Sequence, residues 1–240
     1  MMPSITLALW TVGVGIVCVA AMRRRIEPQR SLATASRLAA IALVVEATVV
    51  LGSDQLGDAG PLALAILVAI LVLDLVVLAS LSVIALRAGP GWAAVGAVLL
   101  LVGWAARTPD LCWAIATMAA WIRQAPLPSE ISQLDGAAVQ LIGIVGGLLT
   151  CGALASTIED CRTRRWAWAL LVCHAVFGVL GVIVAHQMRM SAQLERVVAL
   201  RWQRGVTDAA ASVAMAGVLW RYWHWATHSQ LPRAIGRPRS

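Results

Sequence analysis

The sequence predicts an all-α protein, a polytopic bundle of transmembrane helices. Of its 240 residues, 60% are hydrophobic and only 13% are charged, and the mean hydropathy is +0.81. A soluble domain has about 45–50% apolar and about 25% charged residues. A helix needs about 20 apolar residues to span a bilayer. Apolar runs of about this length recur along the chain. This composition argues against a disordered protein, a coiled coil or a soluble enzyme.

Seven apolar runs are candidate spans, and they predict seven transmembrane helices in one domain over residues 1–240. The second and fourth runs are short and need flanking residues to cross the bilayer. The predicted helices cover residues 4–22, 37–52, 61–86, 91–106, 136–156, 166–187 and 206–225.

The first run is a span and not a signal peptide. A signal peptide carries positive charge before its apolar core. Here no side chain from Met1 to Trp10 is charged, and the charge follows the run as Arg23, Arg24 and Arg25. This order predicts a first helix whose N-terminus lies outside the cell.

The segment 111–122 is apolar, but it is too short for a span. The preceding residues, Thr108-Pro109-Asp110, are typical of a helix start. A helix of about 10–14 apolar residues fits an interfacial or re-entrant position, and Trp113 and Trp121 suit an interface. We therefore expect a separate interfacial or re-entrant helix over 111–122.

The arginines predict the orientation. With seven helices and an outer N-terminus, 13 of the 19 basic residues fall on the cytoplasmic side and six on the outer side. This bias follows the positive-inside rule and places the C-terminus in the cytoplasm. The arginines alternate with apolar runs, so the net charge of +7 indicates membrane topology and not nucleic-acid binding. We expect a multi-pass protein of the cell membrane.

The stretch 188–205 is polar but patterned. Leu194, Val197, Val198 and Trp202 recur at helical spacing. We interpret the stretch as an amphipathic extension of the sixth helix or as a surface helix.

Three polar residues stand out at membrane depth: Glu46, Asp74 and His174. A charged side chain there costs about 2.5–3.5 kcal/mol on insertion scales and marks a functional site. All three fall near the middle of their predicted helices, so they are candidates for a proton or cation pathway. The alternative is that each is neutral and hydrogen-bonded to a neighbouring helix, with Thr48, Ser80 and Thr150 as possible partners.

The sequence contains no enzyme or cofactor signature, and we expect no catalytic residue, metal or cofactor. The chain has no lysine, which excludes lysine Schiff-base chemistry. The other histidines, His186, His224 and His228, do not share the depth of His174, so no pair suits a haem. The five cysteines form neither a CxxC motif nor a zinc pattern.

Small residues predict close packing among the last three helices. Gly143 and Gly147 form a GxxxG motif in the fifth helix. Gly178 and Gly181 leave parts of the surface of the sixth helix without side chains. The seventh carries Ala210, Ala214 and Gly217. Small residues let helices approach closely in a membrane, so we expect these helices to pack together. A GxxxG motif can also mediate contact between helices of two copies of a chain, so a homo-oligomer is a further expectation.

The layout resembles a known group of proteins. The first helix carries Leu9-Trp10-Thr11 before the arginine cluster, a hairpin covers Arg37–Leu86, and the last helix ends near Leu219-Trp220-Arg221. This pattern resembles the N-terminal seven-helix part of a family of actinobacterial membrane proteins that are described either as candidate transporters or as proteins of unknown function. The absence of lysine and asparagine fits a GC-rich host of that kind.

Two classes of function follow. One is a small transporter or proton or cation pathway built around Glu46, Asp74 and His174. The other is a non-catalytic membrane subunit, sensor or accessory component of a larger complex. The expected partners are the lipid bilayer and a protein partner or second copy, and no nucleic acid.

Overall fold

Six α-helices account for almost all of the residues that the structure describes. The structure is a computed structural model, and it describes residues 28–53, 60–87, 91–126, 136–191 and 194–228. No strand occurs in these ranges. The predicted helix at 4–22 lies outside the described residues. The helices are α2 (Pro28–Ser53), α3 (Gly60–Arg87), α4 (Gly91–Ile122), α5 (Gly136–Ser156), α6 (Cys161–Met190) and α7 (Leu194–His228).

Five of the helices, α2 to α6, are long and apolar enough to cross a membrane. The described part of the chain is therefore all-helical, and its long apolar helices are compatible with a membrane protein, as the composition predicts. The helix that contains the predicted seventh span, α7, is not among the five. Its first half carries Arg201, Arg204 and Asp208, and its last turns carry Arg221 and His224, so the apolar stretch between them is short.

The observed helix boundaries agree best with the predicted ones in α3 and α5. The observed α5 begins and ends at the predicted residues, and α3 differs from its prediction by one residue at each end. The earlier start of α2 is at Pro28, where a fixed φ and a missing N–H suit the first turn of a helix. The start of α6 is capped by Asp160, whose carboxylate accepts a hydrogen bond from the backbone N–H of Thr163 at 2.8 Å.

The segment 111–122 is not a separate interfacial or re-entrant helix, which corrects the prediction. It forms the C-terminal part of α4, a continuous helix of 32 residues, or about 48 Å. At its end, Trp121 lies against Gly60, the first residue of α3, where an added Cβ would come within 2.7 Å of the indole ring. The C-terminal end of α4 therefore packs against the start of α3. The helix α4 includes Pro109. A proline is tolerated within a membrane helix because neighbouring groups form hydrogen bonds with the backbone groups that it leaves without a helical partner.

The stretch 188–205 also differs from its interpretation. The sixth helix ends at Met190, with Ser191 as its C-cap, and Leu194 already begins α7. Most of the stretch therefore lengthens the last helix and not the sixth, and it is not a separate surface helix.

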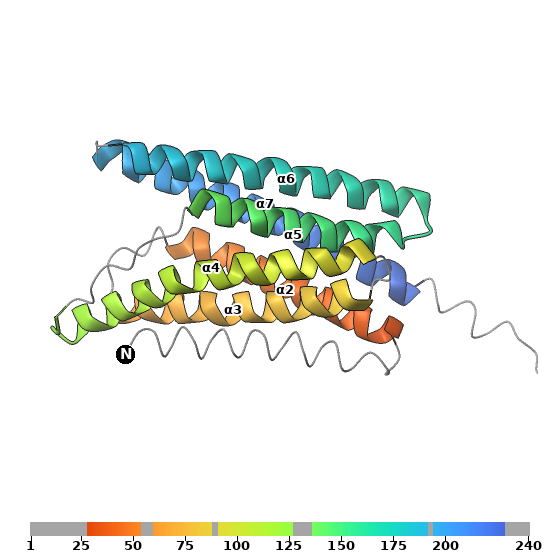
Figure 1. Cartoon of the computed structure of the whole chain (residues 1–240), viewed down its shortest axis with the longest axis horizontal. Helices are drawn as coiled ribbons and strands as arrows, with labels where there is room; N and C mark the ends of the chain where they lie inside the picture. Colours follow the sequence, from red (N-terminus) through yellow and green to blue (C-terminus); the bar gives the residue numbers. More distant parts are fainter. Residues whose placement is uncertain (1–27, 54–59, 88–90, 127–135, 192–193, 229–240) are drawn as a thin grey trace, which may run out of the picture.

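The helices run side by side along the long axis of the molecule (Figure 1) and form a ring. Each helix from α2 to α6 packs against the next along the chain, and α7 packs against α2 and closes the ring. Contacts across the ring occur between α3 and α5 and between α5 and α7. The helices α5, α6 and α7 contact one another in all three pairs, as their small residues lead us to expect.

One half of the ring is filled by a buried apolar cluster. The cluster comes from the N-terminal halves of α2 and α6 and from the C-terminal halves of α3, α5 and α7, which lie at the same end because consecutive helices are antiparallel. Its members include Leu32, Leu43, Leu81, Ile84, Leu154, Leu171, Val218, Leu219 and Tyr222. This end of the ring is closed by close-packed side chains.

Candidate functional site

The other half of the ring encloses a cavity of about 810 Å³. All six described helices line it. Its lining residues include Val50, Leu67, Gln140, Ala185 and Arg204. Each of these lies toward the helix end opposite the apolar cluster, so the cavity occupies mainly the half of the ring that the cluster leaves empty.

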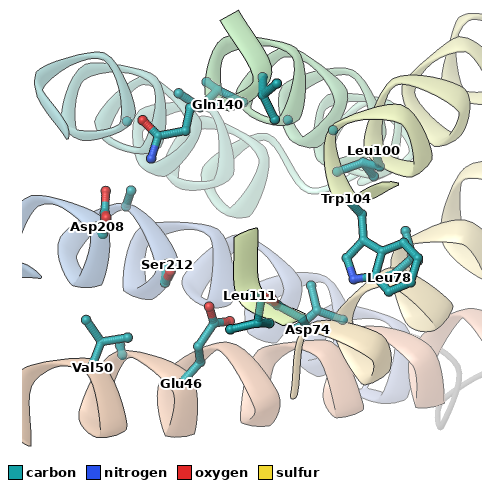
Figure 2. Close-up of a pocket in the computed structure, with 18 of the residues that line it drawn as sticks. Glu46, Val50, Asp74, Leu78, Leu100, Trp104, Leu111, Gln140, Asp208 and Ser212 are labelled. Carbon is teal, nitrogen blue, oxygen red and sulfur yellow. The ribbon is translucent and has the colours of Figure 1, made fainter. Parts of the chain in front are cut away.

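The three polar residues singled out from the sequence all line this cavity. They reach it from three helices: Glu46 from α2, Asp74 from α3 and His174 from α6. Figure 2 shows the carboxyl group of Glu46 pointing away from its own helix, into the space bordered by Ser212 of α7 and Asp74. The side chains of Glu46 and His174 are buried, at 8% and 7% exposure, whereas Asp74 is half-buried.

The position of His174 is fixed by a hydrogen bond between α6 and α7. Its Nδ1 lies 2.9 Å from the carbonyl oxygen of Ala211. Because a carbonyl can only accept, Nδ1 carries the hydrogen, and Nε2 of the neutral ring is left as an acceptor. Among the residues that the structure describes, this buried Nε2 has no hydrogen-bond partner.

Gly147 makes room for this histidine. A Cβ added at Gly147 would lie 3.4 Å from Nε2 of His174 and only 2.5 Å from Cε of Met215. The missing side chain therefore lets α5 approach both α6 and α7. The GxxxG glycine at this position faces the interior of the bundle, where it serves packing within one chain.

The other predicted packing glycines have different surroundings. An added Cβ at Gly178 would lie 2.9 Å from Ile144, and one at Gly181 would lie 2.6 Å from Oδ1 of Asp208. At Gly143 the added Cβ would meet nothing within 4 Å, and Gly143 itself lines the cavity.

Close packing of α4 against α5 was missed from the sequence. An added Cβ at Gly146 would lie 2.7 Å from the backbone nitrogen of Leu100, and one at Gly103 would lie 3.1 Å from Cα of Gly143. Spacing alone did not identify Gly146, because a GxxxG motif does not say which side of a glycine-rich helix meets which neighbour.

Sequence reasoning also missed Asp208, Gln140 and Ser212, which line the cavity with the three predicted residues. Asp208 pairs with Arg204, one turn earlier in α7, with Oδ2 3.5 Å from Nε. An acidic and a basic residue four positions apart are typical of a solvated helix face, so the pair gave no sign of a site. The available signal was that Asp208 lies inside the predicted span 206–225.

Two of the three hydroxyl groups proposed as partners, those of Thr48 and Thr150, do not hydrogen-bond to these residues. Thr48 is exposed, and its Oγ1 donates to the carbonyl of Val44 on its own helix. Thr150 is fully buried against α4, where an added Cβ at Gly96 would lie 2.7 Å from its Oγ1. Thr48 is thus a helix-surface residue and Thr150 belongs to the α4–α5 interface.

No metal site is apparent in the described part of the chain. No group of three or more His, Cys, Asp or Glu side chains within it is placed to hold an ion. The rings of His224 and His228 are 4.3 Å apart, but both residues are exposed near the end of α7. Nearby, Trp223 lies under the guanidinium of Arg37 at 5.3 Å, a cation–π contact. We interpret this end of α7 as an interfacial belt.

The cavity can therefore hold a small molecule among titratable side chains. Its volume lies within the range of about 300–1,000 Å³ that is usual for small-molecule sites. Searches of protein-family models, of curated proteins and of solved structures find no match to this chain.

Proposed function

We propose that the protein is a small proton-coupled transporter whose cavity is the solute site. One observation carries the proposal: Glu46, Asp74, His174 and Asp208 line a single cavity from four different helices. Ionisable residues inside a membrane bundle are costly and mark substrate pathways and proton relays. A protein that needed only a stable bundle would fill this half of the ring with apolar side chains, as it does the other half.

The proton steps follow from the groups present. Nε2 of His174 can accept a proton, because Nδ1 is held by Ala211. The carboxylates of Glu46 and Asp74, on the facing helices, can take up or release protons in the same cavity. Protonation of one group changes the charge that a solute meets, which is the basis of coupling.

The proposed topology has seven transmembrane helices, including 4–22 and 206–225, with the N-terminus outside and the C-terminus in the cytoplasm. In this orientation the apolar cluster closes the cytoplasmic half of the ring and the cavity lies in the outer half. The conformation is then outward-facing. Transport requires the cluster to loosen while the cavity closes at the outer end.

Cys161 tests this orientation, because it is exposed at the start of α6 on the proposed cytoplasmic side. A membrane-impermeant maleimide should label inverted vesicles and not intact cells. The label should be lost in Cys161→Ser. Labelling of this cysteine from outside the cell would reverse the topology.

Proton coupling can be measured in proteoliposomes that contain a pH-sensitive dye. Amines, carboxylates, amino acids and sugars are added in turn to the outside. We expect one class to evoke a pH change, and Glu46→Gln and His174→Asn to abolish it. Glu159→Gln is the matched control, since Glu159 is exposed in the α5–α6 turn and lies outside the cavity. If no class of solute moves protons, the proposal fails.

A second candidate function is a non-catalytic subunit of a larger membrane complex. It is favoured by a stripe of exposed apolar side chains on α3, formed by Val68, Val72 and Val76 at 44%, 52% and 36% exposure. Residues four apart share one helix face, and either lipid or a partner helix fits such a surface. Purification in a mild detergent decides between them: a stoichiometric co-purifying chain supports the subunit, and a lone chain supports the transporter.

A further inference from the structure

The exposed face at the end of α7 is basic and aromatic. Four of its side chains are exposed: Trp220, Arg221, His224 and His228. Residues three, four or seven apart share one side of a helix, so His224 lies in line with His228 and beside both Trp220 and Arg221. The sequence from Gly217 to His228 contains no acidic residue. This face therefore presents a guanidinium beside aromatic side chains, and no carboxylate of its own.

Arg37 of α2, a helix that packs against α7, adds a second exposed guanidinium. Its Cζ lies 5.3 Å from the ring centroid of Trp223, and the ring centroids of Trp223 and Trp220 are 4.6 Å apart. No carboxylate among the described residues forms an ion pair with Arg37. A guanidinium carries five N–H donors in one plane, and contact with an indole ring leaves donors at its edge. These donors are thus held beside the tryptophans and are available to an anion.

An apolar strip begins directly after Arg37 on the outer surface of α2. Its exposed side chains are Leu38, Ile41, Val44 and Val45. Ile41 and Val44 lie four and seven residues after Arg37, so they share its side of the helix. The strip extends for about 12 Å at 1.5 Å per residue. Arg37 therefore lies at the border between an apolar surface and the charged end of the bundle.

This order of groups is that of a phospholipid, in which a charged headgroup is followed by acyl chains. Tryptophan is enriched at the level of the headgroups, and a guanidinium binds a phosphate through two parallel N–H···O hydrogen bonds. A headgroup with its own ammonium, such as phosphocholine, would bring another cation close to Arg37 and Arg221, and like charges repel. The surface therefore fits a lipid whose headgroup carries a net negative charge.

We propose that Arg37 and the end of α7 form a binding site for an anionic phospholipid. The lipid phosphate accepts hydrogen bonds from the guanidinium of Arg37, which Trp223 holds in place, and an acyl chain lies along Ile41 and Val44. In the proposed orientation this end of the bundle faces the cytoplasm, where anionic lipids attract basic segments of membrane proteins. Arg37 does not line the cavity, so this site is separate from the proposed solute site and does not depend on transport.

Native mass spectrometry of the full-length protein tests this site, because it counts the lipids that stay bound after the detergent is removed. The probes are dioleoylphosphatidylglycerol and dioleoylphosphatidylcholine, which have identical acyl chains and differ in net charge. We expect phosphatidylglycerol to bind with a Kd about fivefold lower or less. Glycerol phosphate, which has the phosphate but no acyl chain, should not displace it at the same concentration.

Variants locate the binding site. Arg37→Gln should weaken phosphatidylglycerol binding about fivefold or more and bring it close to that of phosphatidylcholine. Arg123→Gln is the matched control, because Arg123 is an exposed arginine just after α4, at the opposite end of the bundle. Arg37→Lys keeps the charge but loses the planar donors, so its affinity should fall between those of wild type and Arg37→Gln. If Arg37→Gln does not give a monodisperse helical protein, Arg37→Lys is compared with Arg123→Lys.

Several results would overturn the inference. They are an equal affinity for the two lipids, displacement of phosphatidylglycerol by glycerol phosphate, an unchanged affinity in folded Arg37→Gln, and an equal loss of affinity in the Arg37 and Arg123 variants. The last result would show that positive charge at either end of the bundle is enough to hold the lipid.

Discussion

Nδ1 of His174 on α6 lies 2.9 Å from the carbonyl oxygen of Ala211 on α7. This contact joins two neighbouring helices at the level of the cavity and fixes which ring nitrogen carries the hydrogen. Because the ring cannot turn without losing the bond, Nε2 is held in place, buried and without a hydrogen-bond partner among the described residues. The same residue therefore has a structural role at Nδ1, while Nε2 stays available for the proton transfer that the proposed function requires.

The two roles of His174 can be separated by substitution. In His174→Asn the amide nitrogen occupies nearly the place of Nδ1 and keeps the bond to Ala211, but no group replaces Nε2. We expect its stability to stay near wild type and its pH-dependent activity to be lost. His174→Leu loses the bond as well, at about 0.5–1.5 kcal/mol. Unfolding by SDS titration measures the stability, and equal destabilisation in both variants would show that the bond does not matter.

Glu46 should respond differently to neutral and apolar replacements. It is buried and points into the cavity. Glu46→Gln keeps hydrogen-bonding atoms and should leave the free energy of unfolding nearly unchanged, while it abolishes proton-coupled transport. Glu46→Leu should destabilise the protein by about 1–3 kcal/mol, because groups that face it lose their partner. Retention of transport in Glu46→Gln would show that this carboxyl is not part of the proton path.

Much of the fold could be predicted from the chain alone, because apolar runs set the helices of a membrane protein directly. The ranges 61–86 and 136–156 agree with α3 and α5 to within one residue. Counting residues along the helices placed Glu46, Asp74 and His174 near the middle of their predicted spans and left open whether they converge; in the structure all three line one cavity.

The errors have two physical sources. The local signal at Thr108-Pro109-Asp110 is that of a helix start, but α4 continues through it and packs against α3, with Trp121 near its end lying against Gly60. In α7 the pattern of charges after Leu194 is that of a surface helix, and only the three-dimensional structure shows that Asp208 turns inward over Gly181. In both cases contacts with a neighbouring helix determine the structure, and the sequence alone does not show which helix that neighbour is.

Two glycines three residues apart on α5 should have opposite sensitivities. At Gly146 an added methyl would lie 2.7 Å from the backbone nitrogen of Leu100, which cannot move without shifting α4. We expect Gly146→Ala to destabilise the bundle by about 1–3 kcal/mol through overpacking. At Gly143 the methyl would enter open space, so Gly143→Ala should be neutral or stabilising by up to about 1 kcal/mol through helix propensity.

Thermal unfolding in detergent measures this pair, and each variant is the other's control. Similar effects from both substitutions would contradict the packing of α4 on α5. If instead Gly143→Ala alone prevented folding, the GxxxG motif would serve association between chains, and size-exclusion chromatography would show the change of oligomeric state.

The N-cap of α6 should make the stability of the folded protein depend on pH. Asp160 lies before the first residue of the helix, outside the membrane-spanning segment. Hydrogen bonds from Thr163 lower the pKa of its carboxyl below the usual value of 3.8, with smaller contributions from the backbone N–H and the charge of Arg162. The folded protein thus prefers the ionised form. Its stabilising effect is complete above pH 3.8 and is lost as the pH falls through the lower, folded-state pKa.

Comparison with Asp160→Asn isolates this effect, because asparagine also caps a helix but does not titrate. The difference in melting temperature between wild type and Asp160→Asn should be constant at neutral and mildly acidic pH and should decrease below about pH 3.8. Asp160→Ala should be less stable than both near neutral pH, since the N–H of Thr163 then has no side-chain acceptor. Because Asp160 is fully exposed, salt should reduce the part that comes from Arg162 and leave the hydrogen-bonded part. A difference that grows as the pH falls would mean that the protonated carboxyl is the better cap, contrary to the geometry.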